Sequence, residues 1–114
     1  MSLQETDAES ASFAVAPRVS LADIEAAIKA RVDLNAGTMH DAVFGGQLGK
    51  GDPLRLLSIC ILTMRNGFTV IGNAAPASPE NFNAEYGKKL AYEDAIRQLW
   101  PLMGFALRER LAAS

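Results

Sequence analysis

The fold class is decided by the stretch Leu56-Leu-Ser-Ile-Cys-Ile-Leu-Thr-Met-Arg-Asn-Gly-Phe-Thr-Val-Ile-Gly72. It contains two runs of β-branched and apolar residues, which favour β-strands. Between them lies Asn66-Gly67, the dipeptide preferred in two-residue type I′ turns because both turn residues need a positive φ. The stretch therefore predicts a β-hairpin in which Thr63 faces Val70.

Both faces of this hairpin are apolar, whereas a half-exposed hairpin alternates apolar and polar residues. One face carries Leu57, Ile59, Ile61, Phe68 and Val70, and the other carries Leu56, Cys60, Leu62, Met64 and Ile71. An isolated two-stranded hairpin is marginally stable in water, and the longer first strand leaves an exposed edge. We therefore expect a homo-oligomer, most simply a dimer, in which a second copy continues the sheet or covers the apolar face.

A helix is predicted on the N-terminal side of the hairpin, from about Leu21 to Val32. Ser20 is a favourable N-cap, and Asp23, three residues later, completes a capping box. Apolar residues then recur at spacings of three and four, as on one buried helix face. They are Leu21, Ile24, Ile28 and Val32.

A long helix is predicted on the C-terminal side. It opens with Ser78-Pro79-Glu80, which combines an N-cap, a proline at the first helical position and an acid in the first turn. At about 100° per residue, the apolar residues fall on one broad arc. They are Phe82, Tyr86, Ile96, Leu99, Trp100, Met103 and Leu107. Pro101 removes one helical hydrogen bond, so we expect a kink or break near Trp100 and an end at about Leu111.

Two segments have no regular period. Residues 1–17 carry Glu5, Asp7 and Glu9 without a basic residue, and we expect them to form a disordered acidic tail. Residues 35–53 contain five glycines, which predicts a loop, and a loop of this length is mobile or functional. The order of elements predicts one α+β domain over residues 18–114, with both helices covering one face of the hairpin.

Composition excludes several classes of protein. The 114 residues are 49% hydrophobic and 21% charged, which is too apolar for a wholly disordered chain, and no apolar run is long enough for a membrane span. The net charge of −2 argues against a general basic binder of nucleic acid. The single cysteine, Cys60, can form neither an intramolecular disulfide nor a CxxC pair, and the cytoplasm is the expected compartment.

No catalytic, metal or cofactor site is evident, so we expect a protein that is not an enzyme and needs no cofactor. The glycine-rich segment around Lys50 does not match a P-loop, because Phe44 stands where the first glycine is required and Gly51 stands where Ser or Thr is. His40 has no second histidine or paired cysteine to complete a metal site. Cys60 lies among Ile and Leu, where burial favours an inert thiol.

Five residues are candidate contacts for a partner or ligand. In the loop, Phe44 would supply an apolar anchor, and His40 and Lys50 would supply polar contacts. Lys88 and Lys89 lie in the predicted C-terminal helix, which carries much of the basic charge, and they would bind an anionic partner. The alternatives are that the loop is a dispensable insertion and that the lysines belong to a solvated helix face.

Several short motifs occur in a specific order along the chain. They are Arg18-Val-Ser-Leu-Ala-Asp-Ile-Glu25, Asn66-Gly-Phe-Thr-Val-x-Gly72, Ser78-Pro-Glu-Asn-Phe-Asn-Ala-Glu-x-Gly87, Ala91-Tyr-Glu-Asp-Ala95 and Leu99-Trp-Pro-Leu-x-Gly104. Together they resemble a family of small phage and prophage proteins, the gp49-like proteins. The resemblance implies a phage origin and no catalytic residues. Relatives often have a Glu-Ser/Ala-Ala-Cys stretch where this chain has Asn73-Ala-Ala-Pro76, so no role of that cysteine transfers.

Two classes of function remain open at this point. The first is a non-enzymatic phage accessory protein that binds a host protein or a small ligand, for example to counter host defence. The phage resemblance, the lack of a catalytic constellation and the expected oligomer favour it. The second is a binder of nucleic acid or a nucleotide, in which oligomer symmetry gathers Lys50, Lys88, Lys89 and neighbouring arginines into one patch. The near-neutral charge of the domain makes this the less favoured class.

Overall fold

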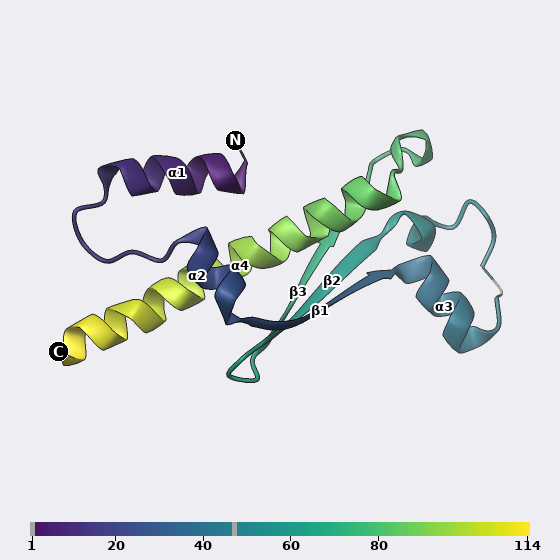
Figure 1. Ribbon diagram of the computed structural model, residues 1–114. Coiled ribbons are helices and arrows are strands. Elements are labelled where there is room, and N and C mark those ends of the chain that lie inside the picture. Colours follow the sequence, from purple (N-terminus) through teal and green to yellow (C-terminus); the bar gives the residue numbers. More distant parts are fainter. Residues whose placement is uncertain (1, 47) are drawn as a thin grey trace.

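The computed structural model describes residues 2–46 and 48–114. Its centre is an antiparallel sheet with the strand order β1-β2-β3, formed by Ile28–Asn35, Ser58–Met64 and Thr69–Ala74. The long helix α4 (Ala84–Ala113) crosses one face of the sheet (Figure 1). The α+β class and the long C-terminal helix are confirmed, and the sheet has one strand more than the predicted hairpin.

The predicted N-terminal helix is correct at its start and wrong at its end. Helix α2 (Leu21–Ala27) begins with the predicted capping box, in which the Asp23 amide donates to Ser20 Oγ and the Ser20 amide donates to Asp23 Oδ2. After Ala27 the chain becomes extended and forms β1, which pairs antiparallel with β2. Pairing with β2 gives these backbone groups hydrogen bonds that outweigh the local helical pattern.

The hairpin is present, but its turn is one residue longer than predicted. The Met64 amide donates to Phe68 O (2.8 Å) and the Gly67 amide donates to Met64 O (2.9 Å), so the loop has three residues. Gly67 has a φ of 89°, whereas Asn66 has a negative φ like every other described non-glycine residue. This is a type I turn followed by a glycine bulge, which needs one left-handed residue where a type I′ turn needs two.

The longer turn shifts the register of the hairpin by one residue. Thr63 pairs with Thr69 instead of Val70, and Leu62 pairs with Val70. Because side chains alternate between faces, the shift moves every β3 side chain to the opposite face from the one predicted. Val70 therefore lies on the buried face, and Ile71 lies on the other face.

The core lies between the sheet and the first half of α4. Its members are Leu3, Leu21, Ile24, Cys60, Leu62, Met64, Val70, Ala91, Ala95, Ile96 and Leu99. Gly72 allows the helix to approach β3 closely, since a Cβ atom at this position would lie 2.1 Å from Ala91 O and 2.5 Å from Ala95 N. Small residues on both sides of this contact thus set the spacing between helix and sheet.

Helix α4 begins later than predicted and continues past the proline. Ser78 makes no capping bond with its side chain, and Pro79–Asn81 forms only a short 3₁₀ turn, η2. The N-cap is Asn83, whose Oδ1 accepts a hydrogen bond from the Tyr86 amide (2.9 Å). The helix then runs to Ala113 without a break at Pro101.

The expectation of a disordered tail is wrong for residues 3–13, which form helix α1 (Leu3–Phe13). Ser2 is its N-cap, and its Oγ accepts a hydrogen bond from the Glu5 amide (3.0 Å). Leu3 is the one buried residue of this helix. Because α1 has no apolar stripe, hydrophobic periodicity could not have revealed it.

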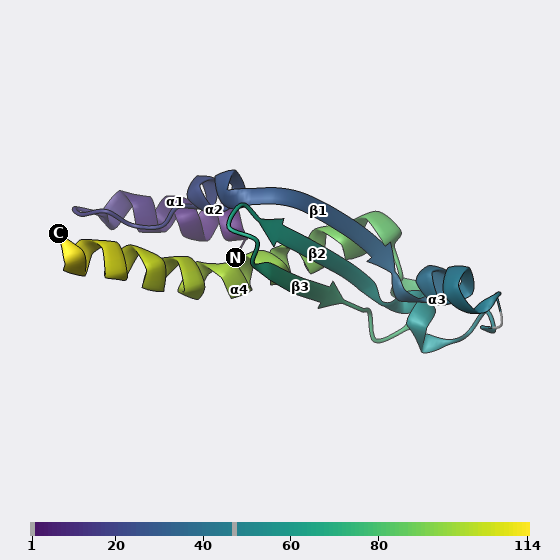
Figure 2. The ribbon, with the colours of Figure 1, turned by 90° about the horizontal axis from the view of Figure 1, so that it is seen from below.

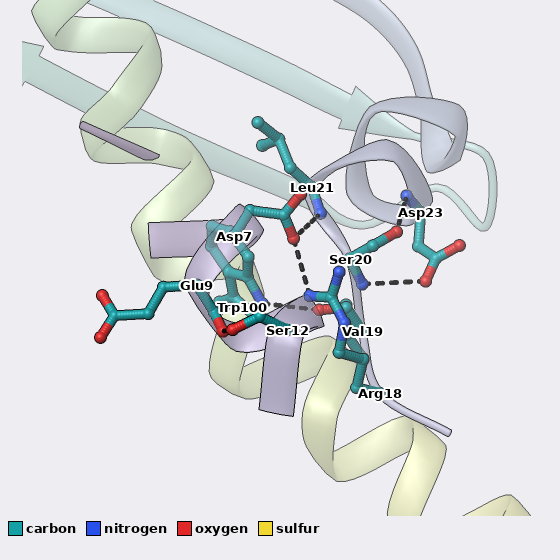
Figure 3. A network of polar contacts seen from close by, with 9 residues as sticks. All are labelled: Asp7, Glu9, Ser12, Arg18, Val19, Ser20, Leu21, Asp23 and Trp100. Atoms are coloured by element: carbon teal, nitrogen blue, oxygen red, sulfur yellow. Dashed lines mark hydrogen bonds and ion pairs between the residues drawn. The ribbon is translucent and has the colours of Figure 1, made fainter. Parts of the chain in front are cut away.

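Polar contacts hold α1 and the following segment against the rest of the molecule (Figure 3). Asp7 accepts hydrogen bonds from Arg18 Nη1 (2.8 Å) and from the Leu21 amide (3.0 Å) at the start of α2. These bonds, that from Arg18 first, hold the pKa of Asp7 below its ordinary value. Trp100 Nε1 donates to Val19 O (3.0 Å), which ties the same segment to α4.

Candidate functional site

The glycine-rich segment predicted as a loop contains a helix, α3 (Ala36–Phe44), at the far end of β1 (Figure 1). Asn35 caps its N-terminus by accepting a hydrogen bond from the Thr38 amide (3.1 Å). Gly45, with a φ of 85°, ends it in the left-handed conformation. Asn at the N-cap and Gly after the last turn are recognised helix signals. The five glycines of the segment favoured a loop instead and outweighed these signals in the prediction.

Arg55 anchors the chain that follows α3. It lies in the 3₁₀ turn η1 (Pro53–Leu56) and pairs with Asp41 of α3 at 2.9 Å. Its guanidinium also donates to Leu48 O (2.9 Å) and Gly49 O (3.0 Å). A Cβ at Gly37 would lie 2.6 Å from Arg55 Cγ, so a glycine is needed there. Arg55 therefore anchors the glycine-rich segment, and the sequence gives no local sign of this role.

The predicted contact residues of this segment lie on α3 and in the turn after it. The rings of His40 and Phe44 are one helical turn apart, with centroids at 4.7 Å. Phe44 is 65% exposed, and its neighbours Met39 and Val43 are exposed as well. Lys50 is exposed and forms no ion pair with any residue that the structure describes. This end of the molecule thus presents a small apolar helix surface.

Lys88 and Lys89 lie in a groove between β1 and the first turns of α4. We call it the basic groove, and it is lined by Arg31, Asp33, Glu85, Lys88, Lys89 and Tyr92. The Arg31 guanidinium lies 4.2 Å from the centre of the Tyr92 ring, a cation–π arrangement. Arg31 also pairs with Asp33 at 3.1 Å. The groove therefore offers an ordered guanidinium on an aromatic platform, beside two lysines.

Charge in the basic groove is partly compensated. Lys88 Nζ pairs with Glu85 at 3.4 Å, whereas Lys89 has no ion pair among residues 2–46 and 48–114. Tyr92 donates its hydroxyl proton to Glu25 Oε2 (3.2 Å). Burial, with help from the nearby Glu25 charge, raises the pKa of Tyr92 to about 12. The phenol therefore stays neutral at physiological pH. Three basic and two acidic side chains line the groove, so an anionic ligand would meet a net positive charge.

The open face of the sheet, opposite α4, is a surface that the sequence did not predict correctly. It carries Val32, Leu34, Ile59, Ile61 and Ile71, as the strand register requires. Figure 2 looks onto this face, and no described helix lies over it. Val32 is 46% exposed and Ile71 is 56% exposed. The alternation of apolar Ala30, Val32 and Leu34 with charged Lys29, Arg31 and Asp33 was the available signal for the third strand.

The five predicted contact residues do not form one site. His40, Phe44 and Lys50 lie on and after α3, beyond the end of the sheet, whereas Lys88 and Lys89 lie on α4 across one face of it (Figure 1). Cys60 is buried, and this burial raises the pKa of its thiol. The described residues contain no group of three or more His, Cys, Asp or Glu that could hold a metal ion. They also form no helix long and apolar enough to span a bilayer.

A family model for the phage protein family described as N4 Gp49/phage Sf6 gene 66 matches residues 19–111. The chain belongs to this phage family. The match runs from the start of α2 to the last turn of α4, so the sheet and the basic groove lie within the family's shared region and α1 lies before it. No curated protein and no solved structure matches the chain.

Proposed function

We propose that this member of the gp49 phage family is a non-enzymatic accessory protein that works as an oligomer. In the host cytoplasm it binds a host protein or a small ligand, in a setting such as counter-defence. The observation that carries this proposal is the open face. Its five apolar side chains extend across all three strands and have no covering element among the described residues. Contiguous exposed apolar surface of this kind is typical of an interaction site.

Leaving this apolar face in water costs free energy. Each square ångström of apolar surface removed from water contributes about 25 cal/mol. Val32 and Ile71 are both roughly half-exposed, so covering them favours association. The remaining chemistry-bearing groups also suit binding better than catalysis, since Cys60 is buried and His40 lies away from the basic groove.

Capture from host lysate tests the proposal. We would compare the tagged wild-type protein with a Val32→Thr/Ile71→Thr variant, which keeps strand-forming residues but makes the open face more polar. Phe105→Ser is the matched control, because Phe105 is 69% exposed and lies on α4 instead. The expected result is a host protein or small metabolite, identified by mass spectrometry, that the wild type and the control retain and the double variant loses. Equal capture by all three would contradict a binding role for the open face.

A second candidate function is binding of nucleic acid or a nucleotide through the basic groove. The observation that favours it is the gathering of Arg31, Lys88 and Lys89 around Tyr92, since guanidinium, ammonium and aromatic groups suit phosphates and bases. Titration of a fluorescent nucleotide and of a single-stranded oligonucleotide would test it. Binding should weaken steeply between low and moderate salt and should weaken further in Lys89→Ala. Binding that is insensitive to both changes would contradict it.

A further inference from the structure

The two edges of the sheet differ in whether their outward-pointing backbone groups are hydrogen-bonded. On the β3 edge, the Asn73 amide donates to Asp94 Oδ2 (3.0 Å) and Ile71 O accepts from Gln98 Nε2 (2.7 Å). Asp94 and Gln98 lie one turn apart on α4, and their side chains are also bonded to each other at 3.4 Å. These two side chains cap the β3 edge, and a further strand cannot use the groups that they occupy.

The β1 edge has no such cap. The Ala36 amide donates to Leu57 O (2.9 Å), so in this register the even-numbered residues of β1 bond to β2, and Arg31 and Asp33 direct their backbone groups outward. Within the described part of the chain, no side chain bonds to those groups. Figure 2 shows β1 along the free margin of the sheet between α2 and α3. An exposed edge of this kind is a template for another strand.

We propose that β1 pairs antiparallel with β1 of a second copy, with the two-fold axis at Val32, to form a continuous six-stranded sheet. This names the interface of the oligomer and so rests on the proposed function. In this register, Arg31 of each copy lies opposite Asp33 of the other. A shift of two residues in either direction would instead place Arg31 opposite Arg31 or Asp33 opposite Asp33. Opposite charges directly across a strand pair stabilise it and like charges destabilise it, so the charges select one register.

Two further features suit this partner. Arg31 is already held by Tyr92 and Asp33, so less side-chain freedom is lost when the second copy binds. On the other side of the strand, Val32 meets Val32 of the second copy, and the two open faces become one larger apolar surface. The pairing also brings the two basic grooves together along the axis, since Arg31 and Asp33 line each of them.

Light scattering after size-exclusion chromatography tests the charge register. The wild type should be a dimer at micromolar concentration. Asp33→Arg places arginines opposite arginines and should raise the dimer dissociation constant by about tenfold or more, as should Arg31→Asp. The double variant Arg31→Asp/Asp33→Arg restores opposite charges and should be dimeric again. Mixing the two single variants should give a heterodimer. Arg108→Asp, which reverses an exposed charge near the C-terminal end of α4 and away from β1, should stay dimeric.

Disulfide trapping tests the position of the axis. Val32 pairs with Val32 of the second copy at a non-hydrogen-bonded position, where Cα atoms lie about 4.5 Å apart and a disulfide can form. Val32→Cys should therefore give a covalent dimer on mild oxidation. Native Cys60 is buried and should not form a competing disulfide. Ile71→Cys, equally accessible on the same face, should not.

The outcomes separate this inference from the function on which it rests. A wild-type dimer that keeps its affinity in both single variants, or that cross-links through Ile71→Cys and not through Val32→Cys, overturns the β1 interface and leaves an oligomeric binder. A folded wild-type monomer at micromolar concentration overturns the oligomer as well. Circular dichroism of each variant shows that loss of the dimer is not loss of the fold.

Discussion

Residues 84–100 of α4 pack against the sheet, whereas residues 101–113 run past its end (Figure 1). All the buried residues of the helix lie in the first half: Ala91, Glu93, Ala95, Ile96 and Leu99. In the second half, Leu102 is 46% exposed and Phe105 is 69% exposed. The first half of α4 thus supplies all of its buried residues, whereas the second half is mostly exposed and contributes only Met103 to the edge of the core.

The difference follows from the lengths of the two elements. A helix of 30 residues is about 45 Å long, and a strand of seven residues is about 23 Å long. About half of α4 therefore has no sheet beneath it. An apolar arc on a long helix therefore does not identify the buried part of the helix, because the length of the sheet beneath it decides how much is buried.

Gly72→Ala should have the largest effect on stability. Its Cβ would lie 2.1 Å from the backbone oxygen of Ala91, and backbone atoms cannot rotate away, so α4 must shift from the sheet. We expect a loss of about 2 kcal/mol or more, measured by urea denaturation. An unchanged midpoint would show that the helix does not approach β3 so closely.

Ile96→Val should destabilise the protein less than Gly72→Ala does, and it should distinguish the first half of α4 from the second. Ile96 is completely buried, and removal of one methyl group leaves a cavity that costs about 1 kcal/mol. The matched change Leu102→Val in the second half should alter stability by less than about 0.5 kcal/mol, as is usual at exposed positions. Equal losses at both positions would mean that the second half is packed too.

Gly104→Ala should change stability in the opposite direction from Gly72→Ala. An added Cβ at Gly104 meets no atom within 4 Å, and glycine inside a helix costs about 0.5–1 kcal/mol relative to alanine. We expect a gain of that size, read from the thermal midpoint. A loss would reveal a contact made by the second half of α4.

Phe105→Ser should have the smallest effect on the isolated chain. Phe105 is mostly in water, so its replacement should change the free energy of unfolding by less than about 0.5 kcal/mol. Chemical denaturation at low protein concentration measures this. A larger destabilisation would place Phe105 in a contact and would weaken its use as a control in the capture experiment.

Local signals in the sequence predicted the elements whose determinants are close together. The hairpin, the capping box at Ser20 and the long C-terminal helix all depend on residues within a few positions of one another. Strand β1 depends on partners far along the chain, since Asp33 pairs with Cys60. Ile28 and Val32 also fit a helical spacing, so the sequence of β1 was ambiguous until its partner was known.

The candidate surfaces were harder to predict for the same reason. Lys88, Lys89 and Tyr92 are close together on α4, but Arg31 joins them only once β1 lies beside α4. The open face needs β1 and the correct hairpin register, and a turn longer by one residue placed Ile71 there. Arg55 anchors Leu48 and Gly49 through their carbonyl oxygens, and no residue-type pattern marks such bonds.

The capped β3 edge sets an upper limit on growth of the sheet. Asp94 and Gln98 prevent a regular strand pairing there, since they occupy the Asn73 amide and Ile71 O, which an incoming strand would need. A sheet with one blocked edge can extend only along β1, and after one antiparallel addition both outer edges are blocked. Fibril growth requires every added copy to offer a fresh edge, so polymerisation along this direction stops after a single step. In the proposed β1 dimer, two polar side chains on α4 would thus limit the sheet to six strands.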